Sequence, residues 1–340
     1  MPFDPDCAAF VARLRELNLP RYETLTLPEA REAMTAARKA AALTPPAIAE
    51  VRDITAETSE GTLRARLYRP VFDSELRSTL VFFHGGGWVL GDLDSHDILC
   101  RRLSIVGRAN VIAFDYRLAP ESKFPAAVND AIAAMKWVFE NASILGLDRG
   151  RIGVGGDSAG ANLAATVAHQ FRDEGRHRIT FQLLIYPAVE ISFSYPSHGL
   201  DEPGLPVLGS TMLWFRDCYL NSRDDEMDWR ASPLLARDFS NLPPSYVLTA
   251  GFDPLADEGA AYVAKLSKAD VPVFHRYFPG QIHGFLTMGP QFPTTEGALF
   301  DIGKWIQGFS SAHDRRTGGS LSGSLLLSTR RGDSTEFVAR

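Results

Sequence analysis

The spacing of hydrophobic positions changes near residue 49 of the chain. Before that point, "AAFVARLRELN" and "PEAREAMTAARKAAAL" carry helical periodicity within residues 5–43, separated by the proline-containing "LPRYETLTLP". After it, "EVRDITAET" and "LRARLYRP" have the pattern of two strands joined across "SEG", as in an antiparallel pair. The pattern therefore predicts a small helical segment followed by the first strands of a sheet.

Short apolar runs then alternate with helical patterns. Strands are expected at "TLVFFH", "NVIAFDYR", "RIGVGGD", "ITFQLLIYP", "SYVLTAGFD" and "VFHRYF", and helices over residues 95–108, 125–141, 159–174, 255–268 and 296–309. The apolar runs are continuous, which is typical of parallel strands covered on both faces. With the first two strands, the sequence predicts an α/β fold with an eight-stranded, mostly parallel sheet flanked by helices.

Two regions depart from this alternation. Residues 191–232 hold Pro, Gly and acidic residues around one amphipathic piece, "STMLWFRDCYLN", and long connections in compact domains tend to be functional. After Phe309 the chain is rich in Gly, Ser and Arg without periodicity, and we take its "RGD" as a chance match. The predicted organisation is N-terminal cap helices over 1–48, an α/β domain over 49–190 and 233–310, a cap insertion over 191–232 and a flexible tail over 311–340.

Composition and charge narrow the class of partner. Of the 340 residues, 45% are hydrophobic and 22% charged, as in ordinary globular proteins with a sizeable core. The net charge is −6 and no basic block with interleaved aromatic residues occurs, so a nucleic-acid binder is disfavoured. A small molecule is the expected partner.

Cysteines and the start of the chain suggest a cellular location. Cys7, Cys100 and Cys218 are odd in number and widely spaced, which favours neither a disulfide framework nor a zinc site. The start, "MPFDPDCAAFVARL", lacks the basic and apolar regions of a signal peptide, and no segment reaches the ~18 apolar residues of a membrane span. We expect a cytoplasmic protein.

The most informative motif is "RIGVGGDSAGANLAA". A strand ending at Asp157 and a helix beginning after Ser158 place GxSxG on a sharp strand-to-helix turn, which lifts the serine hydroxyl above the sheet. A P-loop would need Lys and Ser or Thr where Ala161 and Asn162 stand, and a dinucleotide fingerprint would need glycine at position 158. The motif therefore indicates a serine nucleophile.

A serine nucleophile needs a base, and the base needs a carboxylate that sets its tautomer. His283, in "PGQIHGF", is expected in a loop after the strand "VFHRYF", and Asp253 ends the preceding strand. The separation, 283 − 253 = 30 positions, is about one strand-helix-strand unit, so both loops open on the same sheet edge as Ser158. The order Ser, Asp, His is that of α/β-hydrolases. Asp257 competes for the acid, but it lies one turn into the helix, and we favour Asp253.

Three consecutive glycines follow His84 in "VFFHGGGWVLGD". Their amides and that of Ala159, the residue after the nucleophile, can donate to the oxygen of a tetrahedral intermediate without a side chain in the way. We expect His84 to shape this loop rather than to act as a base. In "GDLDSHD", metal binding by Asp92, Asp94, His96 and Asp97 is conceivable, but capping of the following helix by Asp94 or Ser95 is preferred.

With HGGGW, GDSAG, DPLAD and IHGF in this order, the sequence resembles the hormone-sensitive-lipase-like esterases, bacterial family IV of the α/β-hydrolase fold. Further phrases are similar to that family, among them "DYRLAPESKFPAAVNDA", "FQLLIYPAV" and "WRASPLLARDFSNLPPSYVLTAGFDPLADEG". The likeness runs from residue 5 to 309. Two departures are Ala161, where a glycine is common, and the tail beyond residue 310.

The resemblance implies hydrolysis of short to medium acyl esters without cofactor or metal, a helical cap, and suggests a homodimer. Carried over by position, the resemblance names Ser158 as nucleophile, His283 as base, Asp253 as acid and Gly86, Gly87 and Ala159 as the main oxyanion donors, with Gly85 letting the loop bend.

Other functions stay open at this point. A non-catalytic ligand-binding relative, similar to the plant gibberellin receptors, is disfavoured because the chain retains all three triad residues. An amidase, a peptidase or a deacetylase uses the same triad, whereas the charged N-terminal helices disfavour a lipase at lipid interfaces. Candidates to line a substrate pocket, with core packing as the alternative, are Phe3, Trp88, Leu205, Met212, Trp214 and Phe215.

Overall fold

A computed structural model describes residues 2–40, 44–72, 75–289 and 292–311. Residues 312–340 of the predicted tail, with its "RGD", and the end of the second N-terminal helical stretch at 41–43 lie outside these residues, whereas Ser311 ends a helix. Among the described residues, eight strands form one sheet in the order β1-β2-β4-β3-β5-β6-β7-β8. Their bounds are β1 Glu50–Thr58, β2 Gly61–Arg69, β3 Thr79–Phe83, β4 Asn110–Phe114, β5 Ile152–Asp157, β6 Gln182–Ile185, β7 Ser245–Phe252 and β8 Val273–Ile282.

The sheet is mostly parallel, as the sequence predicts. β1 pairs with β2 and β2 with β4 in antiparallel fashion, and the other neighbours are parallel. The carboxyl ends of β3, β5, β7 and β8 therefore meet at one edge of the sheet, and the functional motifs follow these strands.

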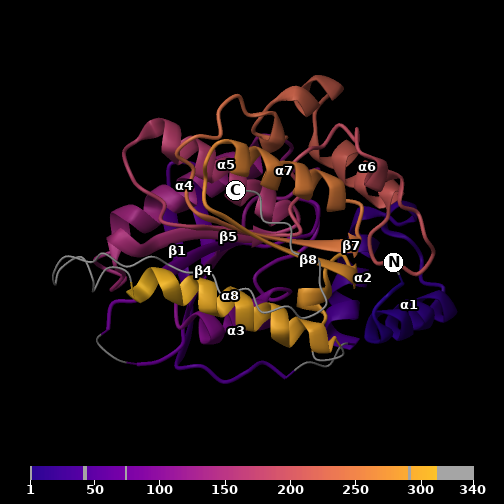
Figure 1. Cartoon of the computed structure of the whole chain (residues 1–340), viewed down its shortest axis with the longest axis horizontal. Helices are drawn as coiled ribbons and strands as arrows, with labels where there is room; N and C mark the ends of the chain where they lie inside the picture. The colour runs from indigo at the N-terminus through magenta and orange to yellow at the C-terminus, as the bar shows by residue number, and fades with distance from the viewer. Residues whose placement is uncertain (1, 41–43, 73–74, 290–291, 312–340) are drawn as a thin grey trace.

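Helices cover both faces of the sheet (Figure 1). α4, α5 and α7 lie on one face and α3 and α8 on the other. β3 shows how one strand serves both: Val81 and Phe83 pack into the first core, and Leu80 and Phe82 into the second. The helices are α1 Pro5–Leu17, α2 Leu27–Ala40, α3 Asp97–Gly107, α4 Ala126–Asn141, α5 Ala159–Glu174, α6 Gly209–Tyr219, α7 Ala256–Lys268 and α8 Pro293–Ser311.

The expectation that β8 ends before "PGQIHGF" is wrong. β8 continues to Ile282, which pairs with Phe252 across a register shift in β7. Pro279 is tolerated there because β8 is an edge strand next to that irregularity. On the open side, the Asp4 amide donates to the Gly280 carbonyl at 3.0 Å. His283 therefore follows directly on a strand end, which holds it more firmly than a free loop.

The N-terminal segment and the 191–232 insertion pack against each other. Glu23 accepts hydrogen bonds from the hydroxyls of Ser210 and Thr211, at 2.6 and 2.9 Å, in the first turn of α6. Arg15 of α1 forms an ion pair with Glu202. The two regions that the sequence predicts as a cap thus contact each other, and Figure 1 shows α1, α2 and α6 near the same end of the sheet. None of the described helices is both long and apolar enough to cross a membrane.

Candidate active site

Ser158 lies on a sharp turn between β5 and α5. Its φ of 55° and ψ of −120° are unusual for a residue with a side chain, and such strain persists only where the surroundings impose it. The first turn of α5 packs closely on the end of β3. The contact leaves no room for a side chain at Gly160, where a Cβ would lie 2.0 Å from the Phe83 carbonyl oxygen. Gly160 therefore permits the close contact between α5 and β3. This contact fixes the turn on which Ser158 lies.

The structure brings Ser158, His283 and Asp253 together in one row. Nε2 of His283 lies 3.0 Å from Ser158 Oγ, and Nδ1 of His283 lies 2.8 Å from Asp253 Oδ2. The other carboxylate oxygen of Asp253 accepts the Leu255 amide at 2.8 Å. Asp257, the competing acid, instead accepts the Ser197 amide at 2.9 Å. The geometry is that of a nucleophile, a base and the group that orients the base.

The row is almost enclosed by protein. The exposed fractions of Ser158, His283 and Asp253 are 7%, 6% and 1%. Burial by itself lowers the pKa of His283, but the charge and hydrogen bond of Asp253, with the charges of Asp157 and Glu258, outweigh burial and raise this pKa above its ordinary value. The surroundings therefore favour an imidazolium when the histidine takes up a proton.

The glycine loop after β3 ends beside the serine turn. Gly86 and Gly87 have φ of +123° and +60°, conformations that favour glycine. The Gly86 carbonyl accepts the amide of Leu90 at 2.8 Å, which closes a tight turn. Within the described part of the chain, the amides of Gly86, Gly87 and Ala159 form no hydrogen bond, whereas the Gly85 amide donates to Asp157 Oδ1 at 2.9 Å. Three backbone donors are thus free for a ligand.

His84 contacts the loop and not the serine. Its Nδ1 lies 2.8 Å from the Gly85 carbonyl oxygen, its ring stacks on Tyr116 at 4.4 Å, and the Tyr116 hydroxyl donates to the His84 carbonyl at 2.8 Å. Burial lowers its pKa to about 4, so the ring is neutral near pH 7. These contacts fit the expectation that His84 shapes the loop.

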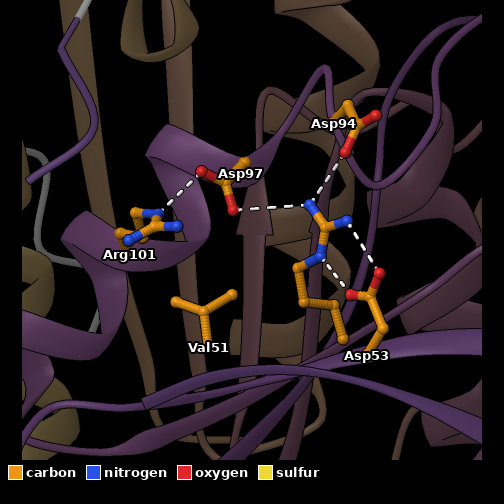
Figure 2. Close-up of a pocket in the computed structure, with 6 residues that line it drawn as sticks. Val51, Asp53, Asp94, Asp97 and Arg101 are labelled. Atoms are coloured by element: carbon orange, nitrogen blue, oxygen red, sulfur yellow. Dashed lines mark hydrogen bonds and ion pairs between the residues drawn. The ribbon is translucent and has the colours of Figure 1, made fainter. Parts of the chain in front are cut away.

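The residues of "GDLDSHD" do not gather around one point but form ion pairs and hydrogen bonds with several different residues. Arg66 binds Asp94 at 2.9 Å and Asp53 at 2.5 Å, and Asp97 pairs with Arg101 (Figure 2). These charges line a hollow between the β1–β2 pair and α3, and none of Ser158, His283 and Asp253 lines it. The expectation that Asp94 or Ser95 caps the helix is wrong: α3 has His96 as its N-cap residue, because Ser95 instead closes a turn with Asp92.

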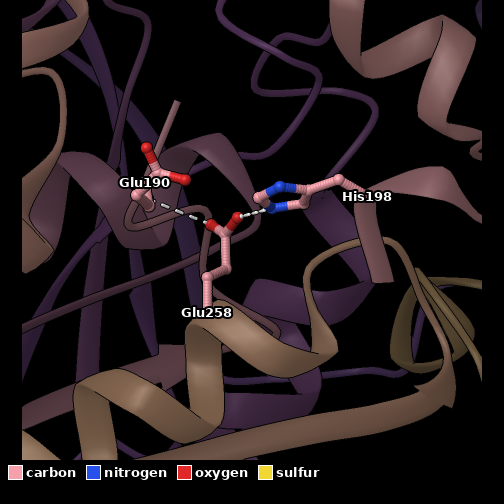
Figure 3. Close-up of side chains that lie close together, drawn as sticks. All are labelled: Glu190, His198 and Glu258. Carbon is pink, nitrogen blue, oxygen red and sulfur yellow. Dashed lines mark hydrogen bonds and ion pairs between the residues drawn. The ribbon is translucent and has the colours of Figure 1, made fainter. Parts of the chain in front are cut away.

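One further cluster has the residue types of a metal site. In the described ranges, only Glu190, His198 and Glu258 bring three such ligand atoms within 4.8 Å of one another. Hydrogen bonds already engage them: Glu258 accepts the amides of Val189 and Glu190 and contacts Nε2 of His198 (Figure 3). The cluster ties α7 to the insertion.

The sequence reasoning missed Tyr186, whose ring centre lies 4.7 Å from that of His283. Tyr186 directly follows β6 at the carboxyl edge of the sheet, and this position in the sequence could have identified it as a neighbour of the site. Among the pocket candidates, Trp88 stacks on Tyr219 at 4.4 Å, and Phe3 stacks on Phe252 at 3.7 Å. Phe215 of α6 covers Gly87, since a Cβ on that glycine would lie 2.1 Å from its ring. Of the remaining pocket candidates, Leu205 and Met212 are buried and Trp214 is half-buried.

The sequence of the chain is similar to those of known ester hydrolases. Residues 80–287 match the sequence model of a family with the alpha/beta hydrolase fold. Ethyl acetate hydrolase of Pseudomonas putida is 38% identical over 320 residues, 90% of this chain and 99% of that protein. Carboxylic ester hydrolase LipN of Mycobacterium tuberculosis is 43% identical over 245 residues, which are 70% of this chain but 65% of LipN.

Solved structures extend the likeness to the whole fold. A hyperthermophilic esterase from the archaeon Pyrobaculum calidifontis has a TM-score of 0.85 and 40% sequence identity, over 92% of this chain and all of that one, at 100%. A thermostable esterase from Pseudomonas putida has a TM-score of 0.87 at 33% identity, over 91% of this chain and 98% of that one. The chain therefore belongs to the α/β-hydrolase family and, within it, to the hormone-sensitive-lipase-like carboxylic ester hydrolases.

Proposed function

We propose that the protein is a serine carboxylesterase that hydrolyses short to medium acyl esters through an acyl-enzyme. The observation that carries the proposal is the hydrogen-bonded row from Ser158 Oγ through His283 to Asp253, at 3.0 and 2.8 Å. These residues come from three separate segments, and a row built from such distant parts of the chain fits a catalytic assignment better than local packing does.

The first half of the reaction is acylation. Ser158 Oγ attacks the ester carbonyl carbon while Nε2 of His283 accepts the hydroxyl proton. The carbonyl electron pair moves onto oxygen, and the amides of Gly86, Gly87 and Ala159 donate hydrogen bonds to it. The carbon–oxygen bond to the alcohol then breaks as His283 returns the proton to the alcohol oxygen.

The second half releases the acid. Water attacks the acyl carbon, His283 takes the water proton, and the serine oxygen leaves with that proton. Throughout, Asp253 accepts from Nδ1–H of His283, which keeps Nε2 free as a base and stabilises the imidazolium. The chemistry uses side chains and amides of the chain alone and needs no cofactor or metal.

The proposed substrate class is that of small esters. The near-complete enclosure of Ser158, at 7% exposed, and the cover of Gly87 by Phe215 favour short acyl groups. The name of the Pseudomonas putida relative, ethyl acetate hydrolase, points the same way. We propose further that the N-terminal helices and the 191–232 insertion form a cap over the catalytic domain. Homodimer formation and a cytoplasmic location stay predictions.

A panel of p-nitrophenyl esters tests the substrate class. We expect the highest kcat/KM with acetate to medium acyl chains and a steady fall with longer ones, because the enclosed site has limited room. p-Nitroacetanilide serves as the matched amide, for which we expect far slower turnover. A maximum at the longest chains, or tight ester binding without turnover, would contradict the proposal, and the second result would favour a binding protein.

A further inference from the structure

A buried carboxylate joins the serine turn to the glycine loop. Asp157 is the last residue of β5, directly before Ser158, and is 4% exposed. Its Oδ1 accepts the Gly85 amide at 2.9 Å, and a Cβ on Gly85 would lie 2.5 Å from its Oδ2. The first glycine of the loop is thus held directly against the residue that precedes the nucleophile.

His96 contacts the same carboxylate. Its Nε2 lies 3.3 Å from Oδ2 and 3.2 Å from Oδ1 of Asp157, and the ring is 2% exposed. An ionised carboxylate only accepts hydrogen bonds, so Nε2 carries a proton and donates. Nδ1 of His96 lies 2.9 Å from Ser95 Oγ, whose one hydroxyl proton is shared between this nitrogen and the Asp92 carbonyl oxygen at 2.8 Å. The turn that starts α3 therefore sets the direction of the ring.

These contacts have a consequence for the three free amides. Gly86 and Gly87 lie on the loop after β3, and Ala159 lies on the serine turn after β5, so the donors to one oxygen come from two segments. Their value for catalysis depends on fractions of an ångström, because preorganised donors act only when aimed at the position of the oxyanion. The side chain of Asp157 bonds one segment to the other.

We propose that Asp157 and His96 are positioning residues that hold the glycine loop in register with the serine turn, so that the amides of Gly86, Gly87 and Ala159 converge on one oxygen. This inference rests on the proposed esterase function. Neither residue touches the ester: Asp157 acts through the Gly85 amide, and His96 acts through Asp157.

The negative charge of Asp157 gives a second reason why His96 matters for the position of the loop. A carboxylate next to a developing oxyanion repels it, and a buried carboxylate without donors is costly. The Gly85 amide and His96 supply two donors that engage Asp157 and hold its charge in place on the side of the loop. Loss of the His96 donor would remove one of the contacts that fix the orientation of this carboxylate against the loop.

The test is a matched pair of variants, His96→Leu and His96→Gln. Gln can place its amide nitrogen near the position of Nε2 and donate to Asp157, whereas Leu fills similar space without a donor. We expect His96→Leu to lower kcat for p-nitrophenyl butyrate by about 10- to 100-fold with little change in KM, somewhat less than the loss of a whole oxyanion donor. We expect His96→Gln to stay within about threefold of the wild type.

A trifluoromethyl ketone separates positioning from packing. Such a ketone adds to the serine, and its tetrahedral oxygen occupies the oxyanion position, so its affinity should fall in parallel with kcat in His96→Leu. Equal losses in Leu and Gln, or an unchanged affinity for the ketone, would overturn the inference. An inactive wild type would instead refute the proposed function, so the two failures are distinguishable.

A second variant covers the case in which His96→Leu does not fold. Asp157→Asn keeps the volume and can still accept the Gly85 amide on Oδ1, but it removes the charge and replaces Oδ2, 3.3 Å from Nε2 of His96, with an amide nitrogen, so the Gly85 amide and His96 compete for Oδ1 alone. We expect the same fall in kcat and in ketone affinity at an unchanged KM. Wild-type kcat and ketone affinity in a folded Asp157→Asn protein would overturn the inference.

Discussion

Ser158→Ala is expected to lower kcat by about 10⁶-fold while leaving the fold unchanged. The substitution removes only Oγ, whose partner is Nε2 of His283 at 3.0 Å, and without it no acyl-enzyme can form. The backbone turn survives because alanine keeps the Cβ that Ser158 already accommodates at φ 55°. Steady-state turnover of p-nitrophenyl butyrate measures the loss, and thermal unfolding checks the fold.

Ser143→Ala is the matched control, since Ser143 is exposed and precedes the amino end of β5, whereas Ser158 follows the carboxyl end of that strand. It removes the same atom and should turn over the ester at the wild-type rate. Retention of activity in Ser158→Ala within tenfold of the wild type would show that another group attacks the ester.

The second large effect is expected for Asp253→Asn, a fall in kcat of about 10⁴-fold. The asparagine amide can donate to Nδ1 of His283, now 2.8 Å from Oδ2, and this favours the tautomer whose Nε2 carries the proton. That tautomer cannot accept the serine proton. Asp257→Asn is the matched control, because its carboxylate accepts the Ser197 amide instead. Equal losses in both variants, or a larger loss in Asp257→Asn, would contradict the assignment of the acid.

The pH dependence of kcat/KM gives an independent test of how Asp253 acts on His283. The base must be neutral, and Asp253, with Asp157 and Glu258, raises the pKa of His283 above the ordinary 6.5. Wild-type kcat/KM should therefore fall as the pH drops, with a midpoint above 6.5. Asp253→Asn removes the charge that raises the pKa of His283, while burial still lowers this pKa. The midpoint of the variant should therefore lie at lower pH than that of the wild type. An unmoved acid limb in the variant would show that His283 does not set it.

Much of the fold and the row of site residues can be predicted from the sequence because their signals are local. Continuous apolar runs mark the parallel strands, and GDSAG marks the turn at Ser158 from residues that adjoin it. The one strand-helix-strand separation between Asp253 and His283 places both at the same edge as Ser158. The structure brings these three side chains within hydrogen-bonding distance of one another.

The remainder depends on contacts through space that no local pattern records. His96 reaches Asp157 across 61 positions, and Glu23 meets the first turn of α6 across 187. The helix start at "GDLDSHD" is predicted wrongly because Ser95 has two possible uses, a cap or a turn with Asp92, and the sequence does not rank them. The extension of β8 to Ile282 likewise depends on its pairing with β7.

Labelling with diethyl p-nitrophenyl phosphate tests most directly whether Ser158 is the nucleophile. Its oxygen should attack phosphorus, His283 should take the proton and p-nitrophenolate should leave, which yields a stable diethylphosphoryl serine. We expect one label per chain, in the peptide with Ser158, in proportion to the activity lost, and none in Ser158→Ala. Label on another residue in proportion to lost activity, or esterase turnover that persists in fully labelled Ser158 protein, would contradict the account.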